Sequence, residues 1–196
     1  MGKKRKRRIV GPPGPEHFSA RAAGKVITVP RPQAIARLID TAIWLWFFEK
    51  DPLSIHLLTL AAYQCLEDLG KDSGKAPRLK AWIGARQFTT AYDFLRHASN
   101  NPLAGIDFAP SSNAPILFDV VASFERIFGN VTIYMRTFWA YFILHPDHPD
   151  PDAAKRLLEH AGLFMPEGIT VDESMKLGRI EFFAKLTEMF AAQYRD

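Results

Sequence analysis

Residues 51–70 read DPLSIHLLTLAAYQCLEDLG, and this stretch is the most helix-like in the chain. Asp51 can accept hydrogen bonds from first-turn N–H groups, and Pro52 fits the first helical turn, where its missing N–H is not needed. Apolar residues then recur three and four positions apart, which is the spacing of one face of an α-helix. Gly70 is a typical helix end. The stretch therefore predicts an amphipathic helix.

The same signals recur along most of the chain, with proline, asparagine or aspartate at helix starts and glycine at helix ends. Asn130 and Asp172 are expected to cap two of these helices. The predicted helices span residues 32–49, 51–70, 85–98, 114–128, 131–144, 151–162 and 172 to the end. No stretch alternates long enough to predict a strand, apart from a weak candidate at residues 26–29. The predicted fold class is all-α, a single bundle of about six to seven helices over residues 33–196.

Residues 1–32 form a different kind of sequence, a block of basic residues followed by glycine and proline. Such a composition buries too little apolar surface to offset the entropy of ordering, so a disordered basic tail is expected. The block consists of Lys3, Lys4, Arg5, Lys6, Arg7 and Arg8. Without it, 19 basic residues remain against 21 acidic ones, so the rest of the chain is nearly neutral. Only this tail is predicted to contact nucleic acid or other phosphates.

Cysteine content and hydropathy suggest a cytoplasmic protein. Cys65 is the only cysteine, so no intrachain disulfide can form, and it is expected to be a small core residue. The basic block runs into glycine and proline instead of an apolar run, so no signal peptide is expected. No apolar stretch is long enough to cross the roughly 30 Å of a bilayer core. Nothing in the sequence identifies a cofactor.

Within residues 51–70, His56, Thr59, Tyr63 and Glu67 are three or four positions apart and share one helical stripe. A histidine, a phenol and a carboxylate in this arrangement could perform acid–base catalysis or bind a metal if the stripe faces a cleft. The alternative is a structural stripe, whose members bond to neighbouring helices or face water.

A second histidine-bearing stripe lies in the predicted helix at 85–98. Asp93 and His97 are four residues apart, so the carboxylate could orient the imidazole and raise its basicity. The alternative is a solvated polar face, because Arg86 and Thr90 fall on the same side.

Arg136 is the only charged residue within residues 131–144, a stretch that is apolar on nearly all sides. If this helix is central, the guanidinium enters the interior and needs a carboxylate, for which Asp93, Glu67 and Asp119 are candidates. A structural ion pair and an anion-binding arginine are the two interpretations. Asp119 itself is expected to lie on a polar face with Ser123 and Arg126.

Residues 145–152 read HPDHPDPD and contain side chains that zinc or manganese accepts. The three prolines fix the backbone without regard to coordination, and no spacing implies a further histidine or cysteine ligand, so an acidic loop before the next helix is the preferred interpretation. Three motifs are absent: a glycine-rich phosphate loop, a Glu-x-x-His pair of di-iron bundles and a paired-cysteine zinc pattern.

Two stretches, DPLSIHLLTLAAYQCLEDL (51–69) and YDFLRHASNNP (92–102), resemble segments of small bacterial helical proteins of uncharacterised activity. In these proteins an FxxHA segment follows a histidine-bearing helix. Together with residues 113–128, the resemblance covers about half of the chain. It implies a helical fold and a bacterial source, and it draws attention to His56 and His97.

The helix order also resembles HEPN-type bundles, many of which are ribonucleases with an Arg-x4–6-His motif. This sequence departs from that motif. Only three residues separate Arg156 from His160, and Arg86 lies too far from His97. HEPN-like catalysis would therefore need an atypical pair.

Two functional hypotheses follow. The first is a helical interaction or regulatory module whose basic tail makes salt-sensitive phosphate contacts and which could form a homodimer through an aromatic-rich helix. The second is an enzyme, either a HEPN-like ribonuclease or a metal-dependent hydrolase. Its proposed catalytic residues are His56, Tyr63, Glu67, Asp93, His97 and Arg136. This hypothesis requires His56 and His97 to lie within hydrogen-bonding or metal-bridging distance.

Overall fold

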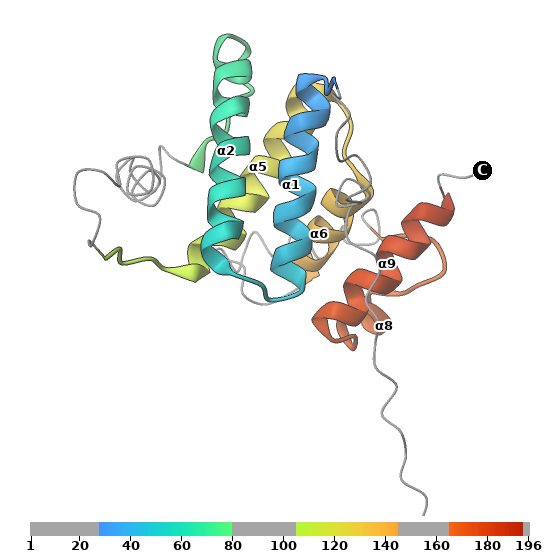
Figure 1. Ribbon diagram of the computed structural model, residues 1–196. Helices are drawn as coiled ribbons and strands as arrows, with labels where there is room; N and C mark the ends of the chain where they lie inside the picture. Colours follow the sequence, from blue (N-terminus) through green and yellow to red (C-terminus); the bar gives the residue numbers. More distant parts are fainter. Residues whose placement is uncertain (1–27, 80–104, 145–164, 194–196) are drawn as a thin grey trace, which may run out of the picture.

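The computed structural model describes residues 28–79, 105–144 and 165–193, and the prediction of an all-α fold is confirmed there. These residues form six α-helices and no strand (Figure 1). The α-helices are α1 (Arg31–Phe47), α2 (Pro52–Gly70), α5 (Asn113–Phe128), α6 (Ile133–Leu144), α8 (Val171–Met175) and α9 (Arg179–Gln193), with short 3-10 turns η3 (Lys71–Ser73) and η4 (Pro110–Ser112).

The first two helices match their predicted bounds closely. Helix α1 starts at Arg31, two residues before the predicted start of the folded domain, and carries Pro32 in its first turn. Helix α2 is capped as expected, since the Asp51 carboxylate accepts a hydrogen bond from the backbone N of Ser54 at 2.8 Å. The chain then folds back so closely that a Cβ on Gly70 would lie 2.4 Å from the backbone N of Ala76. Glycine is therefore required at this position.

Helices α1, α2 and α5 pack against one another, and α6 joins them through α1 and α5. Helix α9 packs mainly on α6, so α8 and α9 lie to one side of the first helices in Figure 1. Each of the five long helices buries an apolar face, and these faces form one hydrophobic core. The largest fully buried side chains are Phe47, Phe138, Phe182, Phe183, Ile35, Ile39, Ile43, Leu66, Ile116, Leu117 and Met135.

An aromatic cluster joins α1, α6 and α9 at the centre of this core. The ring centroid of Phe47 lies 4.5 Å from that of Phe183 and 5.2 Å from that of Tyr141. Trp46 meets Phe138 edge-to-face at 5.1 Å. Such offset and edge-to-face pairs are favourable geometries for aromatic side chains. Helix α9 is thus fixed to both α1 and α6.

Several predicted details differ from the structure. Helix α6 begins at Ile133, and Thr132, not Asn130, supplies the first-turn acceptor, since its hydroxyl accepts from the backbone N of Met135 at 3.2 Å. The last predicted helix is two helices, α8 and α9. Thr170, not Asp172, caps α8 through a reciprocal pair of bonds with Glu173. Tertiary contacts and local capping geometry decided between neighbouring residues of similar capping ability.

Other predictions are only partly covered. Cys65 is half-buried against the core and does not belong to its fully buried part. Residues 28 and 29 are not in a strand, and residues 26 and 27 lie outside the described ranges. The predicted helices at 85–98 and 151–162 and the basic tail up to residue 27 also lie outside them. Among the helices that the structure describes, none is both long and apolar enough to cross a membrane.

Candidate functional site

The histidine of the predicted α2 stripe lies in the interface between α2 and α5. His56 is 2% exposed, and its Nδ1 lies 2.9 Å from Oδ1 of Asn113, the first residue of α5. The Asn113 amide nitrogen donates in turn to the carbonyl of Pro52 at 2.8 Å. Because the amide oxygen is an acceptor, the Nδ1–H of His56 is the donor in this chain of bonds. The histidine thereby links the starts of two helices.

The surroundings of His56 favour the neutral imidazole. The ring of Phe108 packs against it with centroids 4.9 Å apart, in an edge-to-face arrangement. Burial lowers the pKa of His56, and the hydrogen bond that His56 donates to Asn113 only partly opposes this shift. A neutral, buried and hydrogen-bonded histidine fits the structural interpretation of the stripe better than the catalytic one.

The other members of the stripe run from the interior to the surface. Thr59 is buried and its hydroxyl donates to the carbonyl of Ile55 at 2.7 Å, a bond within its own helix. Tyr63 is also buried, whereas Glu67 is half-buried and accepts a hydrogen bond from Gln64 at 3.3 Å. Thr59 and Tyr63 are therefore both buried, and only Glu67 of these three is partly exposed.

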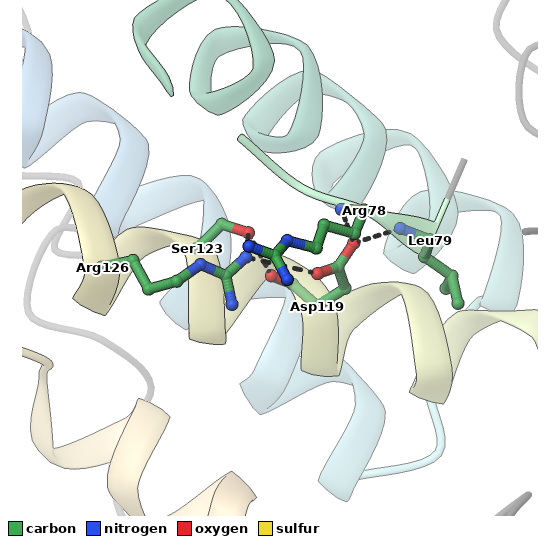
Figure 2. Close-up of polar contacts among 5 residues, drawn as sticks. All are labelled: Arg78, Leu79, Asp119, Ser123 and Arg126. Carbon is green, nitrogen blue, oxygen red and sulfur yellow. Dashed lines mark hydrogen bonds and ion pairs between the residues drawn. The ribbon is translucent and has the colours of Figure 1, made fainter. Parts of the chain in front are cut away.

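The carboxylate of Asp119 on α5 has several partners, shown in Figure 2. Its Oδ2 accepts from the backbone N of Arg78 and of Leu79, both at 2.8 Å. Its Oδ1 lies 3.6 Å from a guanidinium nitrogen of Arg126, which also donates to the Ser123 hydroxyl at 2.7 Å. The predicted polar face is confirmed, and Asp119 additionally anchors the chain at residues 78–79 to α5.

The prediction that Arg136 enters the interior is wrong. Its side chain is exposed, while its neighbours Met135 and Thr137 are fully buried. A helix that is apolar on nearly all sides gives no sequence signal for which face is covered, so its packing partners decide. Asp119, one of the candidate partners of Arg136, pairs with Arg126 instead.

Asp40, the sole acidic residue of α1, is a titratable residue that the sequence pattern did not single out. The hydroxyl of Thr132 donates to its Oδ1 at 2.5 Å. Burial raises the pKa of Asp40 to about 7, although the bond from Thr132 acts in the opposite direction. The available signal was the single carboxylate between the apolar positions Ile39 and Ala42 of an otherwise uncharged stretch.

A second missed residue is Arg179, the first residue of α9. Its guanidinium carbon lies 3.5 Å from the ring centroid of Trp46, a close cation–π contact. Its NH1 is also 3.6 Å from the carboxylate of Glu49, which follows α1. Burial lowers the pKa of Arg179, but an arginine remains charged. Both contacts tie the start of α9 to the end of α1.

Two of the six predicted catalytic residues, and two other segments considered as sites, lie outside the described residues. Asp93, His97, the basic residues Lys3 to Arg8 and the loop at 145–152 all lie there. The convergence of His56 with His97 therefore stays a prediction. Within the ranges that the structure covers, no group of three or more histidine, cysteine, aspartate or glutamate side chains could hold a metal ion.

The fold and these contacts define an all-α helical bundle whose described polar clusters join one helix to another. Comparison with models of protein families, with curated proteins and with solved structures gives no match for this chain.

Proposed function

We propose that this protein is a helical interaction or regulatory module whose basic residues Lys3 to Arg8 contact phosphate groups. The observation that carries the proposal is the position of His56, the central residue of the catalytic hypothesis. It is buried, hydrogen-bonded to Asn113 and covered by Phe108. A general base needs access to a substrate proton, and this geometry uses the imidazole for helix packing.

The distribution of charge supports the second half of the proposal. The six basic residues at positions 3–8 are followed by a chain with 19 basic and 21 acidic residues. A nearly neutral body has little attraction for a polyanion, whereas six adjacent cations displace the counterions of a nucleic acid. Phosphate contacts should therefore depend on this segment and weaken with salt.

The enzymatic alternative, a HEPN-like ribonuclease or a metal-dependent hydrolase, stays a prediction. Two of its six residues, Asp93 and His97, lie outside the described ranges, and no described contact of the other four favours it. Homodimerisation likewise stays a prediction, and sedimentation of the full chain tests it directly.

Binding of a labelled single-stranded oligonucleotide, followed by fluorescence anisotropy at several salt concentrations, tests the proposal. The full chain should bind with log K falling steeply against log salt, with a slope of about −4 if all six cations contact phosphates. Replacing the six basic residues by glutamine should abolish binding and leave the circular dichroism spectrum unchanged.

A matched control replaces six exposed basic residues of the described helices and turns, and it should retain most of the affinity. These residues are Arg31, Lys50, Lys71, Lys75, Lys176 and Lys185. Equal binding by the full chain and by the variant at positions 3–8 would contradict the proposal. Cleavage of the oligonucleotide during the assay, lost on replacing His97, would support the ribonuclease instead.

A further inference from the structure

The contact between Asp40 and Thr132 joins the middle of α1 to the start of α6 through a single hydroxyl group. The Thr132 hydroxyl donates to Asp40 at 2.5 Å and accepts from the backbone N of Met135 at 3.2 Å. One side chain thus serves as the first-turn cap of α6 and as the polar link to α1. Anything that changes the Asp40 carboxyl therefore acts on both helices.

No cation accompanies this carboxyl among the described residues. By helical spacing, Arg37 on α1 and Arg136 on α6 lie one turn from Asp40 and Thr132, yet neither forms an ion pair with Asp40. On the other packed helices, the ionisable groups Tyr63 of α2, Arg126 of α5 and Arg179 of α9 make no electrostatic contribution to its pKa. Burial and the Thr132 hydroxyl are the causes of the shift.

We propose that Asp40 and Thr132 form a pH-operated latch, in which loss of a proton from the Asp40 carboxyl loosens the first turn of α6 from α1. The proton passes to solvent water and leaves, in a partly buried position, a carboxylate that has one hydrogen-bond donor and no ion-pair partner among the described residues. A charge in such surroundings is strongly disfavoured compared with a charge in water. Opening of the contact hydrates the carboxylate and so becomes easier once the proton is lost.

The pH range of the latch follows from the two protonation equilibria. Burial raises the pKa of Asp40 from 3.8 to about 7 in the closed contact, and in an opened contact the group returns toward its ordinary value. Between these values the closed form binds more protons, so the closed form loses stability as pH rises. Above about pH 7 both forms are ionised and the dependence levels off.

The loosened turn would also affect α9. Tyr134 belongs to the first turn of α6, and its ring lies 5.0 Å from that of Phe183 on α9. Phe183 in turn contacts Phe47 on α1 at 4.5 Å. A change at Asp40 therefore reaches α9 through side chains that pack against one another. Its effect is not confined to the contact between Asp40 and Thr132.

Amide hydrogen exchange of the full chain, measured by NMR between pH 5 and 8 and corrected for intrinsic exchange rates, tests the latch. The opening constant at Met135 and Arg136 should rise with pH, by up to about tenfold per unit, and level off above pH 7. In the Asp40→Asn variant, which keeps an acceptor oxygen for Thr132, the opening constant should be independent of pH. The control Asp172→Asn, at an exposed carboxylate of α8, should behave like the native chain.

Identical pH dependence of the opening constants in the native chain and in Asp40→Asn would overturn the proposal. An increase of the opening constant that is equal in all helices would also overturn it. A second measurement needs no substitution, so it holds even if the variant fails to fold. The side-chain carboxyl carbon of Asp40 should titrate with a midpoint near neutrality in the native chain. A midpoint near that of an exposed aspartate excludes the latch.

Discussion

At the scale of single residues, buried His56 and half-buried Asp40 respond to pH in opposite senses. Burial lowers the pKa of His56 below its ordinary value of 6.5. As pH falls below 6.5, the unfolded chain therefore binds more protons than the folded chain. Stability from His56 is therefore complete above pH 6.5 and declines toward acid. Burial raises the pKa of Asp40 to about 7, so its contribution declines as pH rises from about 4 to about 7.

These opposing slopes predict the behaviour of two substitutions. Asp40→Asn removes the contribution of Asp40 to stability, which declines as pH rises. The free energy of unfolding should therefore increase with pH between 5 and 6.5 more steeply than in the native chain. His56→Asn, whose amide can still donate to Asn113, should show the reverse. Its free energy of unfolding should fall more than that of the native chain as pH rises toward neutral. Urea denaturation at half-unit pH intervals measures both curves. Parallel curves for all three proteins would show that neither group titrates as its burial indicates.

At the scale of secondary structure, local signals predicted several helix ends correctly. Asp51 and Pro52 start α2, and Gly129 ends α5 in the left-handed conformation with φ 74°, as expected of a terminal glycine. The start of α6 could not be predicted in this way, because both Asn130 and Thr132 can cap a helix. The choice depends on Asp40, 92 residues away from Thr132.

The sequence also could not predict how deeply each candidate site residue is buried. His56 and Glu67 share a stripe of α2, but His56 is buried and bonds to α5, whereas Glu67 is half-buried and accepts a hydrogen bond within its own helix. Arg136 lies in a helix that is apolar on nearly all sides, so hydropathy does not predict which side faces solvent. In the structure Arg136 is exposed, whereas its neighbours Met135 and Thr137 are buried. Periodicity predicts which residues share a face of a helix, whereas tertiary packing determines what that face contacts.

Asp119 supplies a prediction about how one element is held to another. Asp119→Ala removes the acceptor of two backbone N–H groups and leaves Arg126 without its carboxylate. The carboxylate is 14% exposed, so we expect a loss of about 2 kcal/mol in the free energy of unfolding. Hydrogen exchange at Arg78 and Leu79 should accelerate more than exchange in α2.

Two controls sharpen this experiment. Asp119→Asn keeps an acceptor oxygen and should lose less stability than Asp119→Ala, whereas Asp68→Ala, at an exposed position of α2, should change stability by less than about 0.5 kcal/mol. Unchanged exchange at Arg78 and Leu79 in Asp119→Ala would show that other contacts hold this segment to α5.

At the scale of the whole molecule, α9 is attached to the bundle by contacts with helices that are distant in sequence. It packs mainly on α6 and less extensively on α1. Arg179 stacks on Trp46 at its start, and Phe183 meets Phe47 in its first half. Aromatic side chains from three helices thus meet around one point, so the core of the described residues is continuous from α1 to α9.

A continuous core predicts that damage at its aromatic centre is felt by every helix that meets there. Phe47→Ala removes a fully buried ring that contacts Phe138, Tyr141 and Phe183, and should lower the free energy of unfolding by about 3 to 5 kcal/mol. Hydrogen exchange should accelerate together in α1, α6 and α9, because the ring packs against all three. The control Leu69→Ala, at a side chain that is 37% exposed, should cost less than about 1 kcal/mol. If exchange in α9 stayed at the native rate while α1 opened, α9 would be held by α6 alone, and the aromatic centre would not unite the bundle.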